Sequence, residues 1–182
     1  MSKRSFRSLP PSATRSALLS GRSDHQFREL LYDFFTVANR LEQVRRYLGS
    51  RIGLTGPQYT LMMAVAELQG SSGASVGRVA DYLHVTGTFV TAEFHKLSTR
   101  GFVSKRPDSR DGRVSRLSIA PKGWLALESL FPELQQINDR FFDLASREEF
   151  VSLHRVLQKM VESSRRTLSL VRTLSENAGG TT

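Results

Sequence analysis

Apolar residues recur at spacings of three and four from Phe27 to Leu48. This is the period of one face of an α-helix, so the pattern predicts a long helix over about residues 24 to 48. Ser23 and Gln26 have the spacing of a capping box at its start. A second helix is predicted over about 56 to 69, because a threonine N-cap, a proline in the first turn and a capping-box glutamine open it.

Two short amphipathic helices follow a Gly- and Ser-rich loop. Ser75 and Thr86 stand where N-caps are expected, and His84-Val85 forms the tight turn between the two helices. Their inward positions are apolar: Val76, Val79, Ala80 and Leu83 in the first helix, and Val90, Phe94 and Leu97 in the second. Gly101 ends the second helix. Two short helices joined in this way indicate a helix-turn-helix.

A β-hairpin is predicted next. Residues 102 to 106 have strand character, residues 108 to 112 are dense in turn formers, and Val114, Leu117 and Ile119 begin a returning strand. A helix-turn-helix followed by a hairpin is a winged helix. The fold class is therefore mainly α with a small β-hairpin wing.

The order of elements predicts five segments. Residues 1–22 are expected to form a flexible basic arm, 23–54 a dimerisation helix, and 55–120 the winged helix-turn-helix lobe. Residues 121–176 are expected to form two long C-terminal dimerisation helices, the second opened by a capping box from Ser146 to Glu149 and ending near Leu174. Residues 177–182 are expected to form a disordered tail.

The net charge of +9 is concentrated in two places. Residues 1–23 carry +5 and residues 100–116 carry +4, while the rest of the chain sums to zero. Clustered Lys and Arg suit a polyanion, because each phosphate that they neutralise releases counterions. The Arg- and Ser-rich start also resembles an organelle transit peptide, although its helical amphipathicity is poor.

The composition and motifs of the chain exclude several classes of protein. The chain has no cysteine, and its longest apolar run, 61–66, is far shorter than a membrane span, so we expect a cytoplasmic protein. The four histidines lack metal-ligand spacing, and neither a nucleophile elbow nor a phosphate-binding loop is present. We therefore expect no enzymatic activity, no cofactor and no metal.

Three runs of the chain resemble the MarR family of winged-helix regulators. They are LTGPQYTLM (54–62), SVGRVADYLHVTGTFVTAEFHKLSTRGFV (75–103) and RPDSRDGRVSRLSIAPKG (106–123). The resemblance covers about residues 27 to 165, with departures at Phe89, Ala92 and Glu93, the last of which stands where the family has an apolar residue. It implies a homodimer built from the first and last helices, and a small aromatic or phenolic ligand bound between these helices and the lobe.

The DNA-binding residues are predicted from position and chemistry. On the second helix of the helix-turn-helix, the recognition helix, they are Thr86, Gly87, Thr88, Thr91, His95 and Lys96, which suit base edges, thymine methyl groups and phosphates. On the wing they are Arg106, Asp108, Arg110, Arg113 and Arg116. Arg113 is expected to enter a minor groove, and Asp108 and Arg110 to pair and shape the hairpin. Plain solvent exposure is the alternative for each.

The predicted function is a homodimeric transcriptional regulator that binds a pseudo-palindromic double-stranded DNA operator, as a repressor relieved by a small ligand. A winged helix used for protein contacts, and a protein that coats the chromosome without sequence preference, remain alternatives. No ligand residue is predicted, because the aromatic candidates, Phe27, Phe34, Phe35, Tyr47 and Trp124, have the spacing of core residues.

Overall fold

The structure is a computed structural model that describes residues 9–108, 115–143 and 146–179. The chain divides into two compact units, Met1–Pro132 and Glu133–Thr182, which we describe separately. The first unit contains α1 (His25–Arg51), α2 (Gly56–Leu68), β1 (Ala74–Ser75), α3 (Val76–Leu83), α4 (Gly87–Thr99), β2 (Val103–Pro107), β3 (Ser115–Ile119) and the first part of α5 (Pro121–Phe141). The second holds the rest of α5 and α6 (Arg147–Gly179). The predicted fold class, mainly α with a small hairpin wing, is confirmed.

The helix starts of the lobe follow the predicted caps. Thr55 and Gln58 form a capping box at α2, in which the Gln58 amide N–H donates to Thr55 Oγ1 and the Thr55 N–H donates to Gln58 Oε1. At α4 the Phe89 N–H donates to Thr86 Oγ1 at 3.2 Å. Because these bonds satisfy amides that a helix start leaves without partners, short polar residues fix where α2 and α4 begin.

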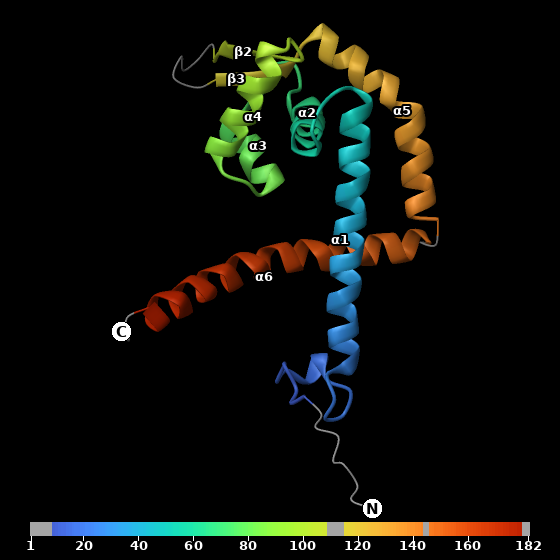
Figure 1. The fold of residues 1–182 in the computed structure, drawn as a ribbon, viewed down its shortest axis with the longest axis vertical. Helices are drawn as coiled ribbons and strands as arrows, with labels where there is room; N and C mark the ends of the chain where they lie inside the picture. The colour runs from blue at the N-terminus through green and yellow to red at the C-terminus, as the bar shows by residue number, and fades with distance from the viewer. Residues whose placement is uncertain (1–8, 109–114, 144–145, 180–182) are drawn as a thin grey trace, which may run out of the picture. The chain divides into compact units, whose positions relative to one another are not determined.

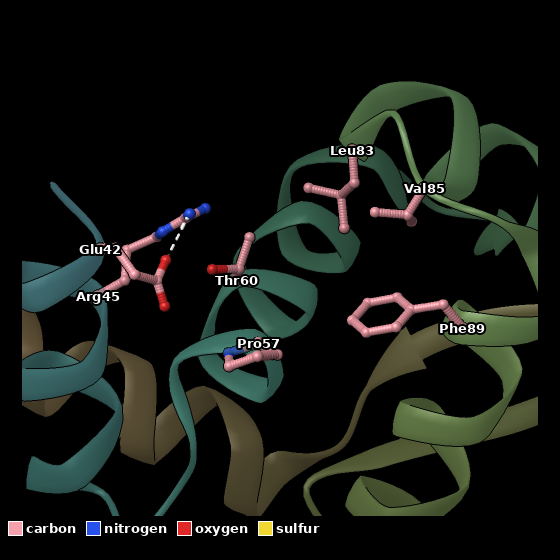
Figure 2. Close-up of a pocket in the computed structure, with 7 residues that line it drawn as sticks. All are labelled: Glu42, Arg45, Pro57, Thr60, Leu83, Val85 and Phe89. Carbon is pink, nitrogen blue, oxygen red and sulfur yellow. Dashed lines mark hydrogen bonds and ion pairs between the residues drawn. The ribbon is translucent and has the colours of Figure 1, made fainter. Parts of the chain in front are cut away.

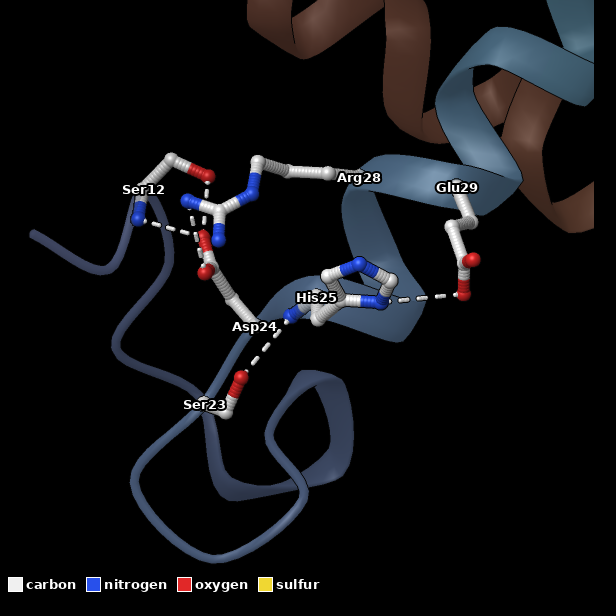
Figure 3. A network of polar contacts seen from close by, with 6 residues as sticks. All are labelled: Ser12, Ser23, Asp24, His25, Arg28 and Glu29. Atoms are coloured by element: carbon white, nitrogen blue, oxygen red, sulfur yellow. Dashed lines mark hydrogen bonds and ion pairs between the residues drawn. The ribbon is translucent and has the colours of Figure 1, made fainter. Parts of the chain in front are cut away.

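The start of α1 differs from the prediction. No capping box forms; Ser23 Oγ accepts instead from the His25 N–H at 3.3 Å. Asp24 is buried, and its carboxylate accepts from both the N–H and the hydroxyl of Ser12 at 2.6 Å and pairs with Arg28 at 3.0 Å (Figure 3). The Ser12 hydrogen bonds lower the pKa of Asp24. Ser12 is therefore held to the N-cap of α1, while the flexible basic arm over residues 1–22 stays a prediction.

A three-stranded antiparallel sheet forms the wing and its base, in the order β1-β3-β2. In the hairpin Val103 lies opposite Ile119, and Arg106 lies opposite Arg116. The Ile119 N–H donates to Gln69 Oε1 at 2.9 Å, which ties β3 to the C-terminal end of α2. Figure 1 shows α2, α3 and α4 gathered beside β2 and β3. The wing is thus anchored to the helix-turn-helix at its base.

The core of the first unit lies in this lobe. Its apolar side chains with at most 2% exposure come from the helices, β1 and β3: Leu48, Leu61, Met62, Val65, Ala74, Val79, Val90, Leu97, Leu117 and Leu127. The α5 helix reaches the base of the wing through Gly123. A Cβ added there would lie 2.1 Å from the Phe102 carbonyl oxygen, so only glycine fits.

The long helices leave apolar surface exposed. In α1 only Leu48 and Gly49 are buried, and no described side chain of α6 is buried. The capping box from Ser146 to Glu149 opens α6 as predicted, and its hydrogen bonds lower the pKa of Glu149. The helix runs to Gly179, beyond the expected end near Leu174 and into the segment for which a disordered tail is predicted. No described helix has the length and apolar character to cross a membrane.

Candidate nucleic-acid interface

The α4 helix presents a polar outer face. Val90, Phe94 and Leu97 are buried against the lobe, while Thr88, Thr91, His95 and Lys96 are exposed. The Thr91 hydroxyl donates to the Gly87 carbonyl oxygen at 3.0 Å, so its lone pairs remain as acceptors. Thr86 has a defined structural role as the N-cap, and Gly87 is half-buried in the first turn. The predicted face is therefore accessible, apart from Gly87.

Cationic side chains face one another across the wing. Arg106 and Arg116 are opposite residues of the hairpin, where two positive charges repel. The repulsion is offset, because Arg116 pairs with Asp108 and the Arg106 guanidinium donates to the Ser71 carbonyl oxygen at 3.2 Å. Arg106 and Arg116 thus place two cations together on the sheet, beside the carboxylate of Asp108.

The wing contains an ion pair that the sequence did not predict. The predicted pairing of Asp108 with Arg110 stays a prediction, because Arg110, like Arg113, lies outside the described residues. In the described part of the wing Asp108 pairs with Arg116. Antiparallel pairing explains this contact, because it brings the residue that follows β2 beside the start of β3.

A groove of about 190 Å³ connects the recognition helix to the wing. It is lined by Thr91, His95 and Ser98 of α4 and by Lys105 of β2, together with Val76, Phe94 and Leu117. Lys105 was missed by the sequence prediction. Its signal was the alternation of the strand: Lys105 lies opposite Leu117, whose side chain points into the lobe, and so projects toward α4 rather than away from it.

Glu93 occupies an unusual place beside this face. Its side chain is only 13% exposed; one carboxylate oxygen accepts from Gln58 Nε2 at 3.3 Å and the other pairs with Lys96 Nζ at 2.6 Å. The contact with α2 explains how an acid stands where the resemblance predicts an apolar residue. Among the described residues of α4, Glu93 and Lys96 are the only acid and the only Lys or Arg, so the recognition helix is neutral.

A second hollow, of about 250 Å³, lies where α1, α2 and the start of α4 meet. Its apolar wall comes from Pro57, Leu83, Val85 and Phe89, and its polar side from Glu42 and Arg45, which pair at 2.7 Å. Figure 2 shows Phe89 and Val85 across the hollow from this ion pair, with Thr60 between them. The aromatic side chain that lines it is Phe89, rather than any of the five aromatic candidates taken from the sequence.

The winged helix-turn-helix lobe has similarity to proteins of a known family. Residues 52–114 match the sequence profile of the MarR family. The MarR resemblance is confirmed over residues 52–114. This match covers the recognition helix and Lys105 of β2, in a family whose solved members are named as transcriptional regulators. The prediction of a DNA-binding regulator rather than an enzyme agrees with this family.

Solved MarR-type structures share the fold. The transcriptional regulator SlyA matches with a TM-score of 0.65 and 20% identity over 78% of this chain and 98% of its own. MepR of S. aureus in complex with DNA matches at 0.63 and 19% identity, over 72% and 96% of the two chains. BpsR of Bordetella bronchiseptica, whose DNA binding is regulated by 6-hydroxynicotinic acid, matches at 0.58 and 19%, over 73% and 98%. No curated protein matches the chain significantly.

Proposed function

We propose that the chain is a cytoplasmic transcriptional regulator that binds a pseudo-palindromic duplex operator as a homodimer and represses until a small ligand releases it. One observation carries the DNA-binding part: the accessible face of α4 and the cationic wing border the same groove, where Thr91 and His95 meet Lys105. A duplex needs both elements at once, because bases are read in a groove while phosphates are held beside it.

We propose that individual residues divide this work. Thr88, Thr91 and His95 contact base edges, the α4 start at Thr86 and Gly87 approaches a phosphate, and Lys96 contacts another phosphate when it leaves Glu93. On the wing, Lys105, Arg106 and Arg116 hold phosphates and Asp108 keeps Arg116 in place. Arg110 and Arg113, assigned from the sequence alone, extend the wing along the duplex, with Arg113 in a minor groove.

The homodimer is supported by the apolar surface of the long helices. Large apolar side chains are exposed along α1 and α6, among them Leu30, Tyr32, Phe35, Leu153 and Leu168. Soluble proteins rarely expose such surface without a partner. Light scattering after size-exclusion chromatography should give twice the 20.4 kDa of one chain. A mass of one chain would contradict the dimer and, with it, the palindromic operator.

The ligand-release part is supported by the hollow between α1, α2 and α4. A flat apolar molecule fits against Phe89 and Val85. A carboxylate on that molecule would replace Glu42 as the ion-pair partner of Arg45. Val85 and Phe89 flank Thr86–Thr88, so an occupant would touch the first turn of the recognition helix. We expect hydroxylated aromatic acids to release the protein from DNA, and Phe89→Ser to reduce this release without weakening binding in their absence.

The experiment that tests the function is selection of binding sites from random duplexes followed by footprinting of the wild-type chain. We expect one discrete protected region with two half-sites about 34 Å apart, as for other dimeric readers of the major groove. Uniform protection would support a chromosome-coating protein, and no protection would support a winged helix used for protein contacts. Either result would overturn the proposal.

A further inference from the structure

Lys96 of the recognition helix has an acidic partner on the same helix, and the consequence of this pair for affinity rests on the proposed DNA binding. Lys96 is an exposed cation on the recognition helix, yet its ammonium nitrogen lies 2.6 Å from Glu93 Oε1. The two residues are three apart, on neighbouring turns of one helix face. Lys96 is the only Lys or Arg among the described residues of α4, and it is thus paired with an acid of the same helix.

Glu93 is held in place independently of Lys96. Its other carboxylate oxygen accepts from Gln58 Nε2, and Gln58 is itself buried and fixed, because its Oε1 accepts from the Thr55 N–H in the α2 capping box. The chain of bonds runs from the start of α2 through Gln58 to Glu93. The carboxylate is therefore positioned before the lysine reaches it, and the lysine is the mobile partner at 57% side-chain exposure.

We propose that Glu93 competes with DNA phosphate for Lys96 and so limits the non-specific affinity of the recognition helix. A DNA phosphate can bind Lys96 only by displacing the Glu93 carboxylate. This lysine therefore adds little to the affinity for any duplex that does not place a phosphate well. The remaining outer face of α4, with Thr88, Thr91 and His95, is neutral when His95 is neutral. Discrimination between duplexes then depends on base contacts, while the general attraction comes from the wing.

Replacing the acid tests the competition. Glu93→Gln removes the charge but keeps an amide oxygen that accepts from Gln58, so the fold should be retained. Glu93→Leu also frees Lys96 from its acidic partner, with the kind of residue that the resemblance predicts. Both variants should bind a random duplex more tightly than wild type. The slope of log K against log salt should steepen by about 0.9, the value for one added phosphate contact, so the gain should shrink about 3.5-fold between 50 and 200 mM salt.

A double-mutant cycle assigns the gain to Lys96. In the Glu93→Gln background, Lys96→Ala should remove the added slope, and it should have a smaller effect in the wild-type background. Glu67→Gln is the matched control. It removes one exposed carboxylate of the same lobe, and this carboxylate makes no ion pair with a lysine among the described residues. It should raise affinity less and should show no coupling to Lys96→Ala.

The results separate two failures. If the wild-type chain binds duplexes with a salt-dependent affinity but neither Glu93 variant steepens the slope, the competition is refuted and the proposed function stands. A gain that persists in Glu93→Gln/Lys96→Ala also refutes it. If neither the wild type nor Glu93→Gln binds any duplex, the proposed function fails and this inference falls with it.

Discussion

The recognition helix and the wing differ in how they carry charge. The described α4 helix has one acid and one Lys or Arg, paired with each other, and its outer face is otherwise uncharged. Residues 100–116, which include the wing, have six bases against two acids. In the proposed complex with DNA, the helix would contribute shape and hydrogen bonding, and the wing would contribute long-range attraction. Two separable measurements follow from this division: discrimination between sequences for the helix, and salt dependence for the wing.

The change with the largest expected effect removes the support that both regions share. Gly123→Ala would place a Cβ 2.1 Å from the Phe102 carbonyl oxygen and 2.8 Å from Ile119 Cγ2, so α5 would have to move off the base of the wing. We expect a loss of about 3 kcal/mol or more in the free energy of unfolding, measured with urea. Gly77→Ala, which meets nothing within 4 Å, is the control and should not destabilise the protein. Equal stability of the two variants would refute the close approach.

Removing cations from the wing should change salt dependence and overall affinity without changing the discrimination between duplexes. Lys105→Ala and Arg106→Ala should each reduce the salt slope by about 0.9 and weaken binding alike on operator and random duplexes. Arg155→Ala, which removes an exposed cation from α6, serves as the control and should leave the slope unchanged. A loss of discrimination without a change in slope would show that the wing, rather than α4, reads the bases.

The N-cap of the recognition helix gives a third test. Thr86→Ala removes the acceptor for the Phe89 N–H and should lower the free energy of unfolding by about 1 kcal/mol, whereas Thr86→Ser should retain it. If Thr86→Ala weakens operator binding while unfolding stays as in wild type, Thr86 contacts DNA directly and its capping role is minor.

The smallest effect is expected from the outer face of α4. Thr88→Ala and His95→Ala should each reduce the preference for operator over a scrambled duplex by about 1 kcal/mol or less, since neither makes a bidentate contact with a base. The salt slope provides the internal control and should remain that of wild type. A changed slope would place these side chains on phosphates and blur the division between helix and wing.

Sequence reasoning succeeded where structure depends on local signals. The caps at Thr55 and Thr86 and the burial of Val79 and Ala80 in α3 and of Val90, Phe94 and Leu97 in α4 were predictable, because capping and helical period are read from neighbouring residues. Contacts between distant segments were not. The Ser12 bonds to Asp24, the Gln58 bond to Glu93 and the Arg116 partner of Asp108 join residues from different elements. The position of Lys105 was accessible from strand alternation, once the register of the hairpin was known.

The central claim is that the winged helix binds duplex DNA with sequence preference. Fluorescence anisotropy of the wild-type chain on a selected operator and on a scrambled duplex, at several salt concentrations, tests it most directly. We predict that log K falls linearly with log salt on both duplexes, that the operator binds more tightly throughout, and that Lys105→Ala lowers both slopes equally. Identical affinities for the two duplexes, or binding that does not depend on salt, would contradict the account.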